Sequence, residues 1–106
     1  MVSRFEVYLV NLDADPRDEA KNSRPGVVIS PDELNRHVGT VIIAPLSSTR
    51  AEYPTRVRTN FLNGERFIIL DQIRTVDKAR LVKKIGEVDE RSRKETLDRL
   101  AEMFAD

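Results

Sequence analysis

The sequence predicts a mainly β protein, in which five to seven short strands form a small, strongly bent antiparallel sheet or barrel and one C-terminal helix packs against it. Two observations lead to this prediction. Short apolar runs, separated by turn-forming residues, follow one another along residues 5–88. After Asp89 the apolar residues are instead spaced as on one side of a helix. The 106 residues fit a single domain, residues 1–106.

The first two strands flank a polar segment. Residues 5–12 are apolar on both alternating faces, which predicts a strand covered on both sides. Residues 11–22 contain four acidic residues and Pro16, so we expect a mobile loop there. Arg24-Pro25-Gly26 then opens a strand over residues 27–29. Proline is tolerated at a strand entrance, and it holds the preceding arginine in an extended conformation.

A helical turn and a central strand follow. Ser30 is expected to cap the turn, with Pro31 at its first position and Glu33 three residues after the cap. Residues 40–46 form the most hydrophobic run of the chain. They are predicted to form a central strand, which Pro45 interrupts because proline has no N–H for the ladder.

The next part of the sheet is predicted to be a hairpin. Residues 53–59 alternate between packed and basic positions. The packed positions are Tyr53, Val57 and Thr59, and the basic ones are Arg56 and Arg58. Asn63-Gly64 predicts the turn, because both residues tolerate positive φ. Residues 67–70 then form the returning, buried strand.

The end of the chain predicts a turn, a strand and a helix. Asp77 is expected to cap a short turn through Arg80, and residues 84–88 form the last strand. Asp89 then starts a helix over residues 90–105, whose apolar stripe we expect in the core or at a dimer contact. The stripe consists of Leu97, Leu100 and Phe104.

Residue counts exclude several kinds of site. With no cysteine, the chain has no disulfide and no thiolate metal site. Its one histidine, His37, excludes a multi-histidine metal site and a catalytic histidine pair, and we expect His37 itself to be non-catalytic. No apolar run reaches the roughly 18–20 residues that cross a membrane. We therefore expect a soluble, cytoplasmic protein without a metal or cofactor.

The net charge is zero, with 18 basic and 18 acidic residues, but the charges are unevenly placed. Residues 1–19 carry −3, residues 20–84 carry +6 and residues 85–106 carry −3. Thirteen of the basic residues are arginine, whose planar guanidinium suits phosphate. A basic centre between acidic ends indicates a polyanion partner or, equally well, an ordinary mixed surface.

Four segments in order carry a family resemblance. They are Phe5-Glu6-Val7-Tyr8-Leu9-Val10-Asn11-Leu12-Asp13, Arg24-Pro25-Gly26-Val27-Val28-Ile29-Ser30 preceded by Glu19, Ala44-Pro45-Leu46-Ser47-Ser48, and Leu70-Asp71-Gln72-Ile73-Arg74-Thr75-Val76-Asp77 followed by Arg80-Leu81. Together they resemble the MazF/PemK-type toxins of toxin–antitoxin systems, in register from about residue 4 to the end of the chain.

The resemblance implies a homodimeric, SH3-like barrel that is a metal-independent, sequence-selective endoribonuclease, neutralised by a MazE-like antitoxin. Cleavage of single-stranded RNA through its own 2′-OH needs a base, charge stabilisation at phosphorus and an acid for the leaving oxygen. It leaves a 2′,3′-cyclic phosphate and a 5′-OH end. We expect the antitoxin to carry an acidic C-terminal tail that competes with RNA for a basic groove.

Three residues match the positions to which the family assigns importance. Arg24, of the Arg-Pro motif, would bind the phosphate oxygens as charge builds up in the transition state. Ser47 stands where the family most often has threonine, and its hydroxyl would hydrogen-bond the phosphate. Glu19 matches a loop glutamate that would accept the 2′-OH proton or orient Arg24.

A second group is expected to bind the RNA chain. Arginines would hold backbone phosphates, while Asp71 and Gln72 would contact base edges. The arginines are Arg50, Arg56, Arg58 and Arg74. For Arg74, a structural ion pair with Asp77 or Asp71 is an alternative.

Two other functions stay open at this stage. CcdB-type toxins resemble this architecture and poison DNA gyrase by binding, without chemistry of their own. An inactive member retained as a binding module is also compatible with serine at position 47.

Overall fold

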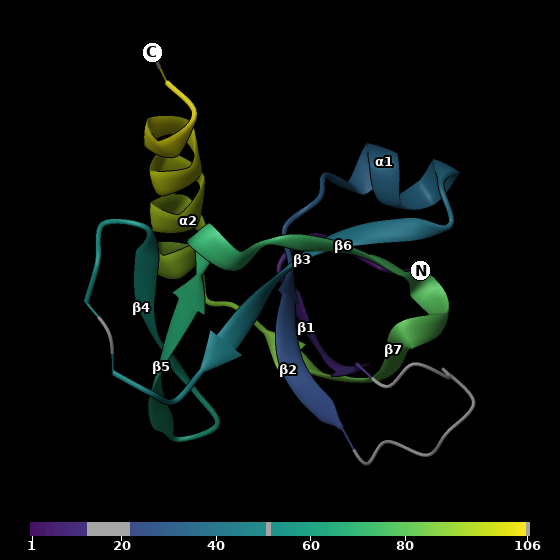
Figure 1. The fold of residues 1–106 in the computed structure, drawn as a ribbon, viewed down its shortest axis with the longest axis horizontal. Helices are drawn as coiled ribbons and strands as arrows, with labels where there is room; N and C mark the ends of the chain where they lie inside the picture. Colours follow the sequence, from purple (N-terminus) through teal and green to yellow (C-terminus); the bar gives the residue numbers. More distant parts are fainter. Residues whose placement is uncertain (13–21, 51, 106) are drawn as a thin grey trace.

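The computed structural model describes residues 1–12, 22–50 and 52–105, and their elements follow one another as shown in Figure 1. The strands are β1 (Glu6–Asn11), β2 (Ser23–Val28), β3 (Thr40–Ser47), β4 (Arg56–Phe61), β5 (Gly64–Ile69), β6 (Arg74–Asp77) and β7 (Leu81–Glu87). The α-helices are α1 (Asp32–His37) and α2 (Glu90–Met103), and the 3₁₀ turns are η1 (Leu70–Gln72) and η2 (Lys78–Arg80).

All strand pairs are antiparallel, in the order β4-β5-β3-β2-β1-β7, with β6 on β3. The ends of this order approach each other, because Phe61 of β4 packs on Gly86 of β7. A Cβ atom at Gly86 would lie 2.7 Å from the Phe61 ring, so only glycine allows this approach. The predicted fold class, a mainly β, SH3-like curled sheet with a C-terminal helix, is confirmed.

Two apolar cores lie on the two faces of the inner strands, as the doubly apolar pattern of residues 5–12 predicts. The larger core contains Phe5, Val7, Val27, Ile29, Ala44, Leu46, Val57, Ile68, Leu70 and Val88. The smaller one contains Val10, Val28, Val41, Ile43 and Val76. Because neighbouring residues such as Val27 and Val28 enter different cores, the register of β2 is fixed from both sides.

Ser30 is not the N-cap of α1, so this prediction is wrong. The helix begins at Asp32 with Pro31 as its N-cap, and no side chain caps it. Ser30 is buried; its Oγ donates to Asn35 Oδ1 at 2.5 Å and accepts from the Ile42 amide at 3.1 Å. The hydroxyl therefore joins α1 to β3 instead of closing the first helical turn.

Pro45 does not end β3, which continues to Ser47. Towards β2, Pro45 pairs with Gly26. On its other side, β3 pairs with β6 as far as Ile43 and with β5 from Leu46 onwards. The strand thus changes partner at Ala44-Pro45. Neither β5 nor β6 pairs with these two residues, so the missing N–H of Pro45 costs no hydrogen bond on this side of β3.

The hairpin and the last strand differ from the predictions in their bounds. β4 begins at Arg56 and leaves Tyr53 exposed, while the alternation of buried Val57 and Thr59 with exposed Arg58 is confirmed. The turn is formed by Leu62 and Asn63, with φ of 49° and 58°, and Gly64 already belongs to β5. β7 begins at Leu81, directly after the turn that Asp77 caps as predicted.

Helix α2 begins as predicted, with the Asp89 carboxylate accepting from the Ser92 amide at 2.8 Å. Its buried residues are Ser92 and Thr96, and Leu100 packs on the larger core. Leu97 is 39% and Phe104 72% exposed, so neither lies in the core, and their place at a dimer contact stays a prediction. Figure 1 shows α2 beside β4, against which it packs. No helix of the described residues is long and apolar enough to span a membrane.

Candidate active site

A cavity of about 760 Å³ lies where β3 changes partner, and we call it the split-sheet cavity. Apolar residues form much of its wall: Val10, Leu12, Pro25, Ile43, Pro45, Leu46 and Ile69. Its polar residues are Arg24, Ser47, Ser48, Arg66, Gln72 and Arg74. Four residues of the predicted site, on three strands and a 3₁₀ turn, are therefore brought together here.

Arg24 enters the cavity from β2. The pairing of β2 with β3 ends at Gly26 and Pro45, and Arg24 and Ser47, each two residues away from that pair, both line the cavity. The guanidinium is exposed and donates to the neighbouring Ser23 carbonyl at 3.2 Å. Within the described part of the chain, Arg24 forms no ion pair. Its charge is thus available to a ligand.

Ser47 is the last residue of β3 and is half-buried. Its Oγ accepts a hydrogen bond from the Thr49 amide at 3.1 Å. This contact orients the oxygen and leaves the hydroxyl proton for a ligand in the cavity. Ser48 lines the cavity beside it.

Gln72 and Arg74 enter from the opposite side, on η1 and β6. The alternative of an ion pair between Arg74 and Asp77 or Asp71 is wrong for the described residues. Asp77 caps η2 by accepting from the Ala79 amide at 2.8 Å, and Asp71 is occupied by Arg56. Arg74 therefore lines the cavity without an ion pair to any described residue.

Asp71 and Arg56 bind each other and do not line the split-sheet cavity. Arg56 Nε lies 3.2 Å from Asp71 Oδ1, and Thr55 Oγ1 donates to the same oxygen at 2.9 Å. The hydrogen bond from Arg56, together with that from Thr55, lowers the pKa of the Asp71 carboxyl. Arg56 lines a second hollow of about 750 Å³ between the β4–β5 hairpin and α2.

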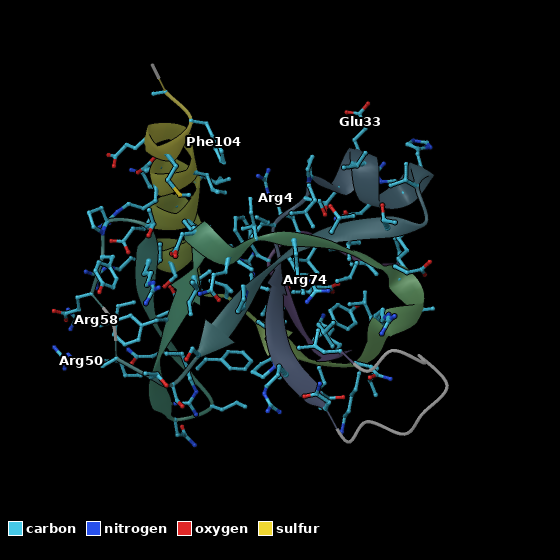
Figure 2. The ribbon with its side chains drawn as sticks, in the orientation of Figure 1. Arg4, Glu33, Arg50, Arg58, Arg74 and Phe104 are labelled. Atoms are coloured by element: carbon cyan, nitrogen blue, oxygen red, sulfur yellow. The ribbon has the colours of Figure 1, made fainter. Side chains whose placement is uncertain are left out.

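Arg50 and Arg58 share two carboxylates on the outer edge of the hairpin. Glu52 accepts from Arg50 at 2.8 Å and from Arg58 at 3.1 Å, and Glu65 lies 3.8 Å and 3.6 Å from the same two guanidinium groups. In Figure 2 the two arginines lie together, well apart from Arg74. Their predicted role in RNA binding stays a prediction.

Glu19, the third residue predicted to be catalytic, lies outside the described residues, as does most of the loop predicted for residues 11–22. Arg66 was not among the residues that the sequence indicated. Strand alternation after the Asn63-Gly64 turn could have placed it, since Arg66 shares a strand face with the core residue Ile68.

The chemistry of the split-sheet cavity favours an anion. Three guanidinium groups, two hydroxyls and one amide line it, and none of its described lining residues is a carboxylate. Among the described residues there is also no group of three or more His, Cys, Asp or Glu side chains that could hold a metal ion. Fold and site together define the class of the protein: a small curled β-barrel with a C-terminal helix and an arginine-lined, anion-binding cavity.

Comparison with known proteins identifies the family. Residues 3–104 match the model of the PemK-like, MazF-like toxins of type II toxin–antitoxin systems, and the chain belongs to this family. The predicted resemblance is thus confirmed. An endoribonuclease MazF of Staphylococcus saprophyticus is 35% identical over 101 residues, which cover 90% of this chain and 84% of that protein.

Solved structures agree with this assignment. A mycobacterial endoribonuclease in complex with its cognate antitoxin is 27% identical, with a TM-score of 0.80, and the match covers 96% of this chain and 93% of that one. MazF from Deinococcus radiodurans is 21% identical with a TM-score of 0.76, covering 96% and 94%, and supports the fold. The predicted enzyme class, endoribonuclease, is that of the curated relative and the mycobacterial structure.

Proposed function

We propose that this chain is the toxin of a type II toxin–antitoxin system and cuts single-stranded RNA, in particular messenger RNA, in the split-sheet cavity. The observation that carries the proposal is that Arg24 and Ser47 line one cavity, and that the Arg24 guanidinium forms no ion pair with any described residue. The 2′-OH of the RNA gives up its proton and its oxygen attacks the adjacent phosphorus; the P–O5′ bond breaks, O5′ takes up a proton from the solvent, and a 2′,3′-cyclic phosphate and a 5′-OH end result. The nucleophile belongs to the substrate, so no metal-activated water is required.

Each polar group has a defined task in this reaction. Arg24 binds the non-bridging oxygens, whose negative charge grows in the transition state. The Ser47 hydroxyl, oriented by the Thr49 amide, donates to the same phosphate. Glu19, predicted from its position five residues before Arg24, takes the 2′-OH proton or orients Arg24. Gln72 and Arg74 contact the RNA from the opposite wall.

The partners follow from the same chemistry. We propose a homodimer and an antitoxin whose acidic C-terminal tail lies in the cleft, where it forms charge-assisted hydrogen bonds with arginines. Mycobacterial and Deinococcus radiodurans relatives have been solved with antitoxins, which supports this partner. Antitoxin affinity should fall as salt rises, and a non-cleavable RNA should compete with the tail.

Arg24→Ala tests the mechanism. The expected loss of about 3–4 kcal/mol of transition-state stabilisation reduces cleavage roughly a hundred- to thousandfold. Because Arg24 is exposed, the melting temperature should stay unchanged. Ser47→Ala should lose most activity and Ser47→Thr should keep it. Arg36→Ala, which removes an exposed charge on α1, is the matched control. Cleavage by Arg24→Ala within threefold of wild type would remove Arg24 from the mechanism.

The same assay separates the alternative functions. A long unstructured RNA is incubated with the pure protein in EDTA, and the cut ends are mapped. Only the ribonuclease cuts under these conditions. A gyrase-binding toxin or an inactive binding module leaves the RNA intact, and that result would overturn the proposed function.

A further inference from the structure

We propose that Arg66 is a second phosphate-binding residue of this site, which holds the RNA backbone next to the phosphate that is cut; this inference rests on the proposed function. Arg66 reaches the split-sheet cavity from β5, on the other side of β3 from Arg24. Ser47 pairs with Phe67, so Arg66 lies one residue before the β5 partner of Ser47. Arg24 and Arg66 thus line one cavity from the strands on the two sides of β3.

The charge of Arg66 is not neutralised by its neighbours. Strand alternation places Glu65 on the opposite face, where its carboxylate faces Arg50 and Arg58. Arg66 forms no ion pair with any described residue, and its guanidinium donates only to the Glu65 carbonyl, from Nη1 at 3.0 Å. A guanidinium has five N–H donors, so several remain for a phosphate.

Gly64 positions this guanidinium. A Cβ atom at Gly64 would lie 2.3 Å from Arg66 Nη1 and 3.1 Å from its Cζ. The half-buried side chain therefore packs directly over a residue without a side chain. Alanine at position 64 would displace the guanidinium while keeping its charge.

A single-stranded substrate carries one phosphate per nucleotide, so a cleft that cuts one phosphate must also hold its neighbours. In the proposed function, Arg24 and Ser47 bind the phosphate that reacts. Arg66, separated from Arg24 by the width of β3, is placed for a different phosphate of the same strand. It should therefore affect substrate binding more than the chemical step.

The test is a binding experiment with a short RNA spanning the mapped cut site, with 2′-O-methyl at that site to prevent cleavage. Arg66→Ala should weaken binding roughly ten- to hundredfold. The slope of log affinity against log salt should fall by about 0.7. In the cleavage assay KM should rise while kcat stays within threefold, and Arg66→Lys should recover part of the loss. Arg36→Ala should change affinity less than twofold.

A methylphosphonate scan identifies the phosphate. Each phosphate of the RNA is replaced in turn by the uncharged analogue. Replacement at one position, other than the cut phosphate, should weaken the binding of the RNA to the wild-type protein but not its binding to Arg66→Ala. Gly64→Ala should weaken binding severalfold in wild type and have no further effect in the Arg66→Ala background.

The failures of the two proposals are distinguishable. A protein that cuts RNA while Arg66→Ala binds it as wild type does would overturn the role of Arg66 and leave the proposed function in place. Equal methylphosphonate profiles for wild type and Arg66→Ala would do the same. A wild-type protein that neither cuts nor binds RNA would overturn both.

Discussion

The hydroxyl groups buried under α2 differ in their hydrogen bonding. Ser92 Oγ donates to Thr59 Oγ1 at 2.8 Å, and Thr59 Oγ1 donates to Asp89 Oδ2 at 3.3 Å. These hydrogen bonds replace the ones that the groups form with water in the unfolded chain. Thr96, fully buried on the same helix, has a hydroxyl without a partner among the described residues. Such a group lowers stability by about 1–3 kcal/mol.

Thr96→Val should therefore raise the free energy of unfolding by about 1 kcal/mol, since valine has nearly the same shape without the unsatisfied oxygen. Ser92→Ala, the matched change one turn earlier, should lower it by about 1 kcal/mol, because it leaves Thr59 with one partner fewer. Urea unfolding of the three proteins measures both values. A destabilised Thr96→Val would show that the hydroxyl has a partner after all.

Which site residues could be predicted depended on the range of their contacts. Arg24 and Ser47 were predicted from the family resemblance, whose motifs are contiguous in sequence and lie at the beginning of β2 and the end of β3. Arg56 and Asp71 are 15 residues apart in the sequence and form an ion pair because β4 pairs with β5. No local sequence pattern predicts this contact. For Arg66, strand alternation could have indicated the face on which it lies, but its place in the cavity also depends on which strands flank β3.

At the scale of elements, the turn of the β4–β5 hairpin lies one residue before the position that the Asn63-Gly64 motif predicts. The Asn-Gly motif predicts the hairpin correctly, but pairing of Phe61 with Gly64 moves the two turn positions to Leu62 and Asn63. Leu62 is consequently left-handed, with φ of 49°, and 63% exposed. The neighbouring strand residues decide the register, because burial of Val57 and Ile68 fixes which residues face the core.

Leu62→Asn should stabilise the protein by about 0.5–1 kcal/mol, because asparagine tolerates the left-handed region better than leucine does. Leu62→Val should destabilise it, because a β-branched side chain fits this region poorly. Both changes are measured by thermal unfolding. Leu62→Asn with an unchanged or lower melting temperature would mean that the exposed leucine makes a contact worth more than the backbone strain.

At the scale of the whole molecule, an ion pair joins the first strand of the chain, β1, to the last, β7. Glu6 of β1, 7% exposed, lies 2.7 Å from Lys84 Nζ of β7, and its carboxylate also accepts from the Ser3 amide at 2.7 Å and from Tyr8 Oη at 3.2 Å. Pairing of β7 with β1 brings these residues together, although they are 78 positions apart. The fold class was predictable from the strand pattern, but the strand order and this contact were not.

The Glu6 carboxyl makes the fold sensitive to acid. Burial alone would raise its pKa, but the hydrogen bonds from Lys84, the Ser3 amide and Tyr8 outweigh burial and hold the pKa below the ordinary 4.5. The unfolded chain therefore takes up the proton first as pH falls, and the stability that Glu6 contributes above pH 4.5 is lost as pH drops through its folded pKa.

Glu6→Gln should accordingly melt several degrees below wild type at pH 7, and the difference should shrink as pH falls below about 4.5. The pKa of Lys84 is raised by its hydrogen bond to Glu6, so the difference should also shrink above pH 10.5 as lysine loses its proton. Glu87→Gln is the matched control, because Glu87 is exposed and lies 3.9 Å from the same amine. It should change the melting temperature little, since exposed pairs contribute little. A Glu6→Gln difference that stays constant from pH 3 to pH 8 would show that the side chain stabilises the fold by packing alone, and that its charge does not hold β1 and β7 together.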